Sequence, residues 1–72
     1  MDAGARLGRV VYALRVNAMM SVEVTAHGAQ LNRETLERIE AGQIEGIRLS
    51  HLVGLSASLG VDVKELLKRA RW

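Results

Sequence analysis

The chain has 72 residues and a net charge of +2, from 10 basic and 8 acidic side chains. Without cysteine it can form neither a disulfide framework nor a thiolate metal site, and two histidines alone do not close a zinc site. No apolar run approaches the ~18 residues of a membrane-spanning helix, and no signal peptide is recognisable. We therefore expect one domain over residues 1–72, with its core at about residues 7–68, located in the cytoplasm.

The first predicted element is an amphipathic helix near the start of the chain. Its apolar residues are spaced by three and four positions, which places them on one helical face. They are Leu7, Val10, Val11, Leu14 and Ala18. A second, short helix is predicted over residues 22–27, because Ser21 is a favourable N-cap and Gly28 a plausible end.

A third helix is predicted over residues 33–40, with Asn32 as its N-cap. Leu36 and Ile39 form its inward pair. The remaining charged positions point away from that pair and make a dense polar face, typical of an element that contacts something. They are Arg33, Glu34, Glu37 and Arg38.

Two further helices are predicted after a loop over residues 43–47. The fourth carries an apolar stripe over residues 49–59 and ends at Gly60. The fifth begins at Asp62, where Glu65 three residues on resembles a capping box, and carries Leu66 and Leu67 on its apolar side. The absence of proline and of alternating β-branched runs also favours an all-α domain.

The stretch from Ser21 to Gly42 has a recognisable order of residues. A Ser cap is followed five residues on by the small Ala26, then by a turn at residues 29–30, the apolar Leu31, a second cap and the ending Ile-Glu-Ala-Gly over 39–42. This order resembles the helix-turn-helix of the Cro/cI-type (xenobiotic response element, XRE) family of DNA-binding proteins. The resemblance implies a compact five-helix bundle of the lambda-repressor-like type with a central helix-turn-helix.

The resemblance also implies site residues. In this architecture the second helix of the motif enters the major groove of double-stranded DNA. The implied base contacts are Arg33, Glu34, Glu37 and Arg38, and the backbone contacts are Ser21, Asn32, Thr35, Gln43 and Arg48. A structural ion pair is implied between Arg15 and Glu40. Candidate contacts for a homodimer are Leu66, Leu67, Ala70 and Trp72.

A simpler interpretation of the charged face remains open. Arg33–Glu37 and Glu34–Arg38 are spaced as i, i+4 pairs, which stabilise a solvated helix without any ligand. The histidines are interpreted as ordinary polar residues, and Met19 and Met20 as core filler.

The sequence departs from the family pattern at the turns. Met19 and Gln30 stand where glycine is usual, so the chain must either adopt a left-handed backbone there, at about 1 kcal/mol each, or form a different turn. Val22 stands where the family usually has a Gln that helps to hold a phosphate, and Thr25 replaces the usual Leu of the second helix.

The function implied is that of a transcriptional regulator, most simply a Cro-like repressor of a phage or mobile element that occupies an operator as a homodimer. No catalytic constellation, cofactor, metal or small-molecule ligand is expected. A protein-interaction module, antitoxin-like and with weak or no DNA binding, is the alternative. Activator and architectural roles stay open.

Overall fold

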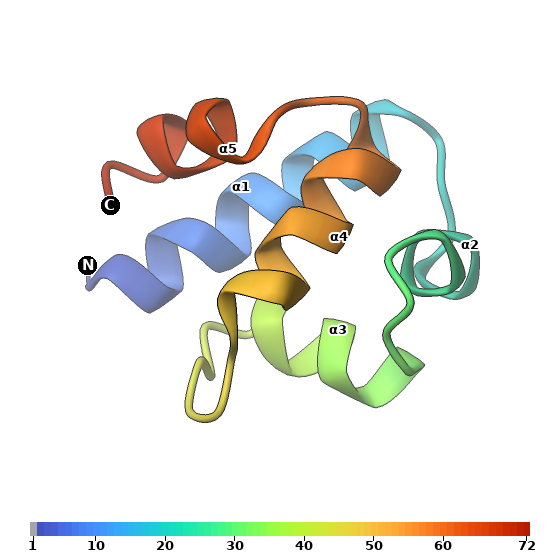
Figure 1. Ribbon diagram of the computed structural model, residues 1–72, viewed down its shortest axis with the longest axis horizontal. Helices are drawn as coiled ribbons and strands as arrows, with labels where there is room; N and C mark the ends of the chain where they lie inside the picture. The colour runs from blue at the N-terminus through green and yellow to red at the C-terminus, as the bar shows by residue number, and fades with distance from the viewer. Residues whose placement is uncertain (1) are drawn as a thin grey trace.

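The computed structural model describes residues 2–72 and contains five helices, with no strand in that range (Figure 1). The helices are α1 (Ala3–Asn17), α2 (Val22–Gly28), α3 (Arg33–Glu40), α4 (Leu49–Leu59) and α5 (Val63–Arg69). The all-α fold expected from the sequence is confirmed. None of the helices within residues 2–72 has the length and apolar composition needed to span a membrane.

Polar side chains fix where four of the helices begin. Asp2, Ser21, Asn32 and Asp62 each accept a hydrogen bond from the backbone amide three residues ahead, at 2.7 to 3.1 Å. These bonds satisfy amides that would otherwise lack a partner at a helix start. The fourth helix begins differently, since the amide of Arg48 donates to Nδ1 of His51 at 3.2 Å.

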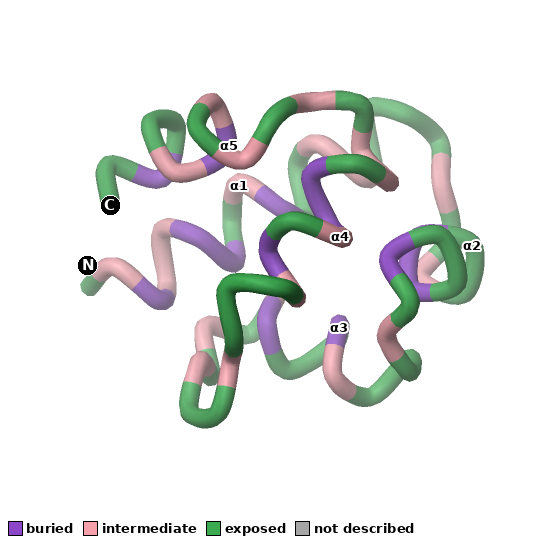
Figure 2. The backbone as a smooth tube through the Cα atoms, in the orientation of Figure 1, coloured by how far each residue is buried: buried purple, intermediate pink, exposed green. Residues whose placement is uncertain are grey.

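The core lies where the apolar faces of the helices meet. Helices α1 and α4 lie between α3 on one side and α5 on the other, and their buried residues face inward (Figures 1 and 2). The largest fully buried side chains are Leu7, Val11, Thr25, Leu36, Ile39, Leu55 and Leu66. The Thr25 hydroxyl is buried without a hydrogen-bond partner in the described part of the chain. Threonine therefore fits this apolar position less well than the leucine that the family usually has there.

Two glycines allow close approach between helices. A Cβ on Gly8 would lie 2.6 Å from the carbonyl oxygens of both Ile39 and Glu40, so α1 touches the end of α3 backbone to backbone. A Cβ on Gly28 would lie 2.7 Å from Oγ of Ser58. Gly28 is the last residue of α2, as the sequence predicted, and its small size allows the close approach to Ser58.

The two turns that flank α2 adopt a left-handed backbone although neither has glycine at the position concerned. Met19 and Gln30 have φ angles of +58° and +60°, so both adopt the left-handed backbone where glycine is usual. Met19 is 93% exposed, and the expectation that it fills the core is wrong. Ala18, expected on the buried stripe, is also exposed, because α1 ends at Asn17 and Ala18 is its C-cap.

The C-terminal helix packs on α1 more fully than expected. Leu66 and Ala70 are completely buried inside the domain, so neither is available to a second copy, and both are removed from the candidate dimer contacts. Leu67 is half-buried and Trp72 is 57% exposed. Arg6 donates from Nε to the Ala70 carbonyl at 2.8 Å and thereby fastens the end of α5 to α1.

Candidate nucleic-acid interface

Helix α3 presents its charged residues to solvent along one edge of the molecule (Figure 1). The buried side chains of Leu36 and Ile39 hold the opposite face of the helix against the core. Because these two residues are three positions apart, they share one face of the short helix, and the opposite face remains exposed. That exposed face consists of Arg33, Glu34, Glu37 and Arg38.

The end of α3 is fastened to α1 by a paired Arg and Glu. Arg15 donates from Nε to Oε2 of Glu40 at 2.7 Å and from Nη2 to Oε1 at 3.0 Å, in the two-bond geometry that favours arginine–carboxylate pairs. Both side chains are only 12% exposed. Nη1 of Arg15 also donates to the carbonyl of Met20 at 3.0 Å, and the guanidinium lies 5.3 Å from the centre of the Tyr12 ring.

This pairing raises the pKa of Arg15, mainly through its hydrogen bond to Glu40. Arginine is charged at all ordinary pH values, and its two bonds to Glu40 clamp the end of α3 to α1. It joins α1, the α1–α2 turn and the end of α3, so the orientation of α3 depends on it.

At the other end of α3, Arg33 contacts two carboxylates. Its Nε donates to Oε2 of Glu37 at 3.2 Å and its Nη1 to Oε2 of Glu23 on α2. The three side chains are between 51% and 61% exposed. The hydrogen bond that Arg33 donates to Glu37 and the charge of Glu23 raise the pKa of Arg33. This outward arginine is restrained by exposed partners that water or a ligand can replace.

Sequence reasoning missed Glu23 as a partner of Arg33. The signal was present, because Glu23 lies in the first turn of one helix and Arg33 in the first turn of the next. Only the tight turn between α2 and α3 brings them together. The i, i+4 pair Arg33–Glu37 is present, whereas Arg38 contacts the Glu45 carbonyl at 3.2 Å instead of Glu34.

The candidate backbone contacts lie at the helix starts and after α3. The oxygens of Ser21 and Asn32 are occupied as caps, and Thr35 is half-buried one turn into α3. Gln43 and Arg48 are exposed in the loop that follows α3 (Figure 1). Of the five, only Arg48 brings a positive charge.

Charge is unevenly distributed along the chain. Residues 21–48, which contain the helix-turn-helix and the loop after it, hold five carboxylates and three arginines, a formal charge of −2. The flanking segments, residues 1–20 and 49–72, together hold seven basic and three acidic residues, a formal charge of +4. The segment that presents α3 therefore lacks the basic excess from which most DNA-binding surfaces draw affinity.

The described residues show no site for a metal. Across residues 2–72, no group of three or more His, Asp or Glu side chains is placed to hold a metal ion.

Comparison with known proteins gives a consistent result. The sequence profile of the Cro/C1-type HTH DNA-binding domain matches residues 13–70. No curated protein sequence matches the chain.

Two solved structures are similar to this one over most of their length. The restriction-modification controller protein C.AhdI from Aeromonas hydrophila is 26% identical, with a TM-score of 0.80 over 86% of this chain and 92% of that chain. The clp gene regulator ClgR from C. glutamicum is 18% identical, with a TM-score of 0.85 over 99% of this chain and 91% of that chain, and shows the shared fold only.

Proposed function

We propose that this chain, which belongs to the Cro/C1-type helix-turn-helix DNA-binding family, reads a specific duplex sequence with α3 and represses transcription as a dimer. The family consists of DNA-binding transcription regulators. The observation that supports sequence reading by this chain is the exposed charged face of α3. Leu36 and Ile39 hold the opposite face of this helix in the core, and the Arg15–Glu40 pair holds its end.

The proposed base contacts follow from the chemistry of the exposed face. The major groove admits an α-helix, and the N-terminal residues of a recognition helix reach the base edges. Arg33 offers two donors that fit O6 and N7 of guanine, and Glu34 offers an acceptor for N4 of cytosine. Glu37 and Arg38 lie one turn further along the same face. On binding, Arg33 exchanges Glu23 and Glu37 for a base.

Contacts to phosphate position α3 without reading sequence. Arg48 supplies the positive charge among the proposed backbone contacts, and Gln43, Thr35 and the capped helix starts at Ser21 and Asn32 supply neutral donors. With a formal charge of −2 over residues 21–48, we expect modest non-specific affinity for DNA.

An apolar surface supports the proposed homodimer. Around a hollow of about 230 Å³, the chain leaves Leu49 and Trp72 largely exposed beside Ile47 and the half-buried Leu67. Exposed apolar groups gathered in this way favour a protein partner, for which we propose a second copy. Two copies of α3 would then enter successive major grooves ~34–36 Å apart and block access of polymerase.

Selection from a pool of random duplex DNA, with sequencing of the bound fraction at low and moderate salt, tests the proposal. We expect enrichment of an inverted repeat whose half-sites lie about one helical turn apart. Enrichment of a single short site would remove the symmetric dimer and keep sequence-specific binding.

The net negative charge of residues 21–48 favours one alternative, a protein-interaction module with weak DNA binding. An interface dominated by apolar burial responds little to salt, whereas phosphate contacts weaken steeply. Weak retention of DNA that disappears at moderate salt, with no enriched sequence, would support the module and contradict the repressor.

A further inference from the structure

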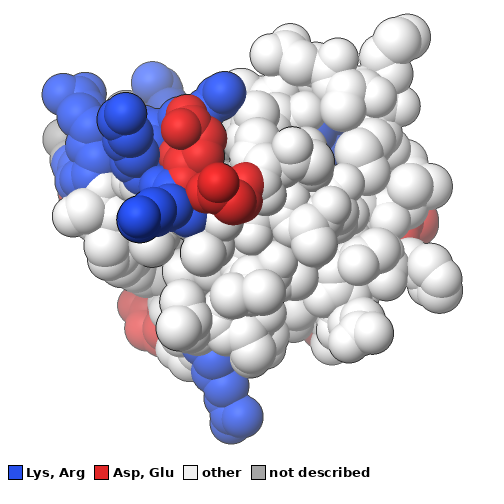
Figure 3. Space-filling view, turned by 45° about the horizontal axis from the view of Figure 1, so that its top comes forward, with Lys and Arg blue, Asp and Glu red and all other residues white. Residues whose placement is uncertain are grey.

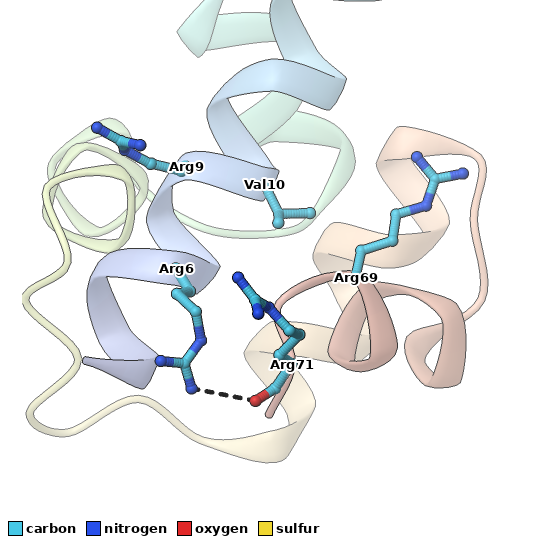
Figure 4. A pocket seen from close by; sticks show the side chains of 5 residues that line it. All are labelled: Arg6, Arg9, Val10, Arg69 and Arg71. Atoms are coloured by element: carbon cyan, nitrogen blue, oxygen red, sulfur yellow. Dashed lines mark hydrogen bonds between the residues drawn. The ribbon is translucent and has the colours of Figure 1, made fainter. Parts of the chain in front are cut away.

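Four arginines surround a shallow hollow between α1 and the C-terminal end of the chain. The hollow has a volume of about 640 Å³ and is lined by Arg6, Arg9, Val10, Arg69 and Arg71, here called the arginine hollow (Figure 4). Basic side chains also gather on the α5 side of the molecule, while much of the face seen there is uncharged (Figure 3). None of these residues belongs to the proposed DNA-reading surface.

The backbone brings these arginines together. Arg6 donates to the carbonyls of Ala70 and Arg71, at 2.8 and 3.1 Å, and so places the end of the chain on α1. Arg71 has a φ angle of +54°, a left-handed conformation in which glycine is usual after a helix. This turn directs the Arg71 side chain back toward α1, between Arg6 and Val10 (Figure 4).

Little negative charge balances the arginine hollow from within. Arg69 is paired with Glu65, at 2.9 Å between Nε and Oε2. The side chains of Arg9 and Arg71 make no hydrogen bond or ion pair in the part of the chain that the structure describes. Like charges held together in this way are relieved by a bound anion.

We propose that the arginine hollow binds phosphate groups. Guanidinium groups from α1 and from the chain end line the same hollow. Together they offer many N–H donors to an anion with several acceptor oxygens, and arginine forms two-bond contacts with phosphate. The only apolar side chain in the lining is Val10, and no aromatic ring is available to stack on a base. The ligand is therefore recognised by its phosphates, as in a polyphosphate chain or the backbone of DNA.

The position of the arginine hollow separates it from the reading surface. Helix α5 lies on one side of α1 and α4, and α3 lies on the other (Figure 1). A duplex seated on α3 is therefore not the one that occupies the hollow, so the phosphates come either from a second duplex or from a free polyphosphate. The inference does not depend on base reading by α3 and can be tested without operator DNA.

The test is titration of the full chain with inorganic tripolyphosphate, followed by NMR of the backbone amides and arginine Nε–H groups. We expect saturable shifts at Arg6, Arg9, Arg69 and Arg71. The double variant Arg9→Gln/Arg71→Gln should bind about tenfold more weakly, because two charge-assisted contacts are lost. The control Lys64→Gln/Lys68→Gln removes the same charge from exposed sites outside the lining and should change affinity less than about twofold.

A second arm identifies the source of the phosphate. Protein bound to an immobilised duplex is mixed with a second, labelled duplex of unrelated sequence. Capture that the Arg9→Gln/Arg71→Gln variant loses, and the control keeps, assigns the arginine hollow to a DNA backbone. Tripolyphosphate binding without capture assigns it to a free polyphosphate.

Three results would overturn the proposal. They are absence of saturable shifts at the lining arginines, equal weakening by the two double variants, and preference for a polyglutamate peptide over tripolyphosphate. Thermal unfolding of each variant confirms that it is folded, and the single variant Arg9→Gln, which leaves the chain end intact, should show a smaller loss in the same direction.

Discussion

The two ends of α3 are held by the same chemistry with different consequences. At its C-terminal end, Glu40 pairs with Arg15, and both side chains are 12% exposed. At its N-terminal end, Arg33 pairs with Glu23 and Glu37, and all three side chains are more than half exposed. Burial removes water as a competitor for the first pair, whereas exposed pairs are worth little because water screens and replaces them. The Arg15–Glu40 pair therefore fixes the end of α3, whereas Arg33 can exchange its two exposed carboxylate partners for a ligand.

The largest effect is expected from breaking the clamp. Glu40→Ala leaves the Arg15 guanidinium charged in a poorly hydrated site, so we expect the free energy of unfolding to fall by about 3 kcal/mol. The measurement is urea denaturation followed by circular dichroism. Glu37→Ala, which removes an exposed partner at the other end of α3, should cost less than about 0.5 kcal/mol. Equal losses in the free energy of unfolding for Glu40→Ala and Glu37→Ala would show that the two ends of α3 are held equally strongly.

A second prediction concerns the backbone contact beside the clamp. Gly8→Ala places a methyl group 2.6 Å from the carbonyls of Ile39 and Glu40, so α1 must move away from α3. We expect a loss of about 2 kcal/mol in the free energy of unfolding. The control is Gly46→Ala, where nothing lies within 4 Å and only the φ angle of +79° opposes a side chain. Its cost should be about 1 kcal/mol, and a larger loss than at Gly8 would contradict the close approach.

At the exposed end of α3, a substitution should alter binding and leave stability unchanged. Arg33→Ala should weaken binding by about 1–3 kcal/mol at one base position and relax specificity there, since a two-bond contact is lost. Arg48→Ala should weaken binding to all sequences alike and flatten the salt dependence. Binding curves on a panel of single-base variants of the selected operator separate the two. Uniform weakening by Arg33→Ala would remove it from the base-reading residues.

The smallest effect is expected at the turn that leads into α3. Gln30 has a φ angle of +60°, so Gln30→Gly relieves strain and should stabilise the protein by up to about 0.5 kcal/mol after the entropy cost of glycine. Ala57→Gly, at an exposed position within α4, should instead destabilise it by about 1 kcal/mol. Thermal unfolding measures both changes in stability. Destabilisation by Gln30→Gly would contradict backbone strain at Gln30.

Local patterns predicted the elements of the fold well. The caps Ser21, Asn32 and Asp62 signal helix starts within three residues, and the spacing of Leu36 and Ile39 signals which face is buried. The starts of α2, α3 and α5 and the five-helix architecture therefore followed from the sequence, whereas the start of α1 after the cap Asp2 was not predicted. The family resemblance added the implied partner of Arg15, which lies 25 positions away in the chain.

Contacts made only by packing were not predictable in the same way. Gly8 was not recognised as a contact, because its small size matters only once α3 lies against it. Leu66 and Ala70 have the pattern of either a core or an interface, and only the position of α1 decides between them. Arg6 donates to a carbonyl 64 residues away, a bond that no local pattern indicates.

The bond from Arg6 to the Ala70 carbonyl has a consequence for how the domain opens. Terminal helices usually fray first, and their amides exchange with solvent through local opening. Here the last turn of α5 is tied to the first turns of α1, and Leu66 is sealed in the common core. We therefore expect the amides in the last turn of α5 to exchange with deuterium more slowly than those of a terminal helix without such a tie.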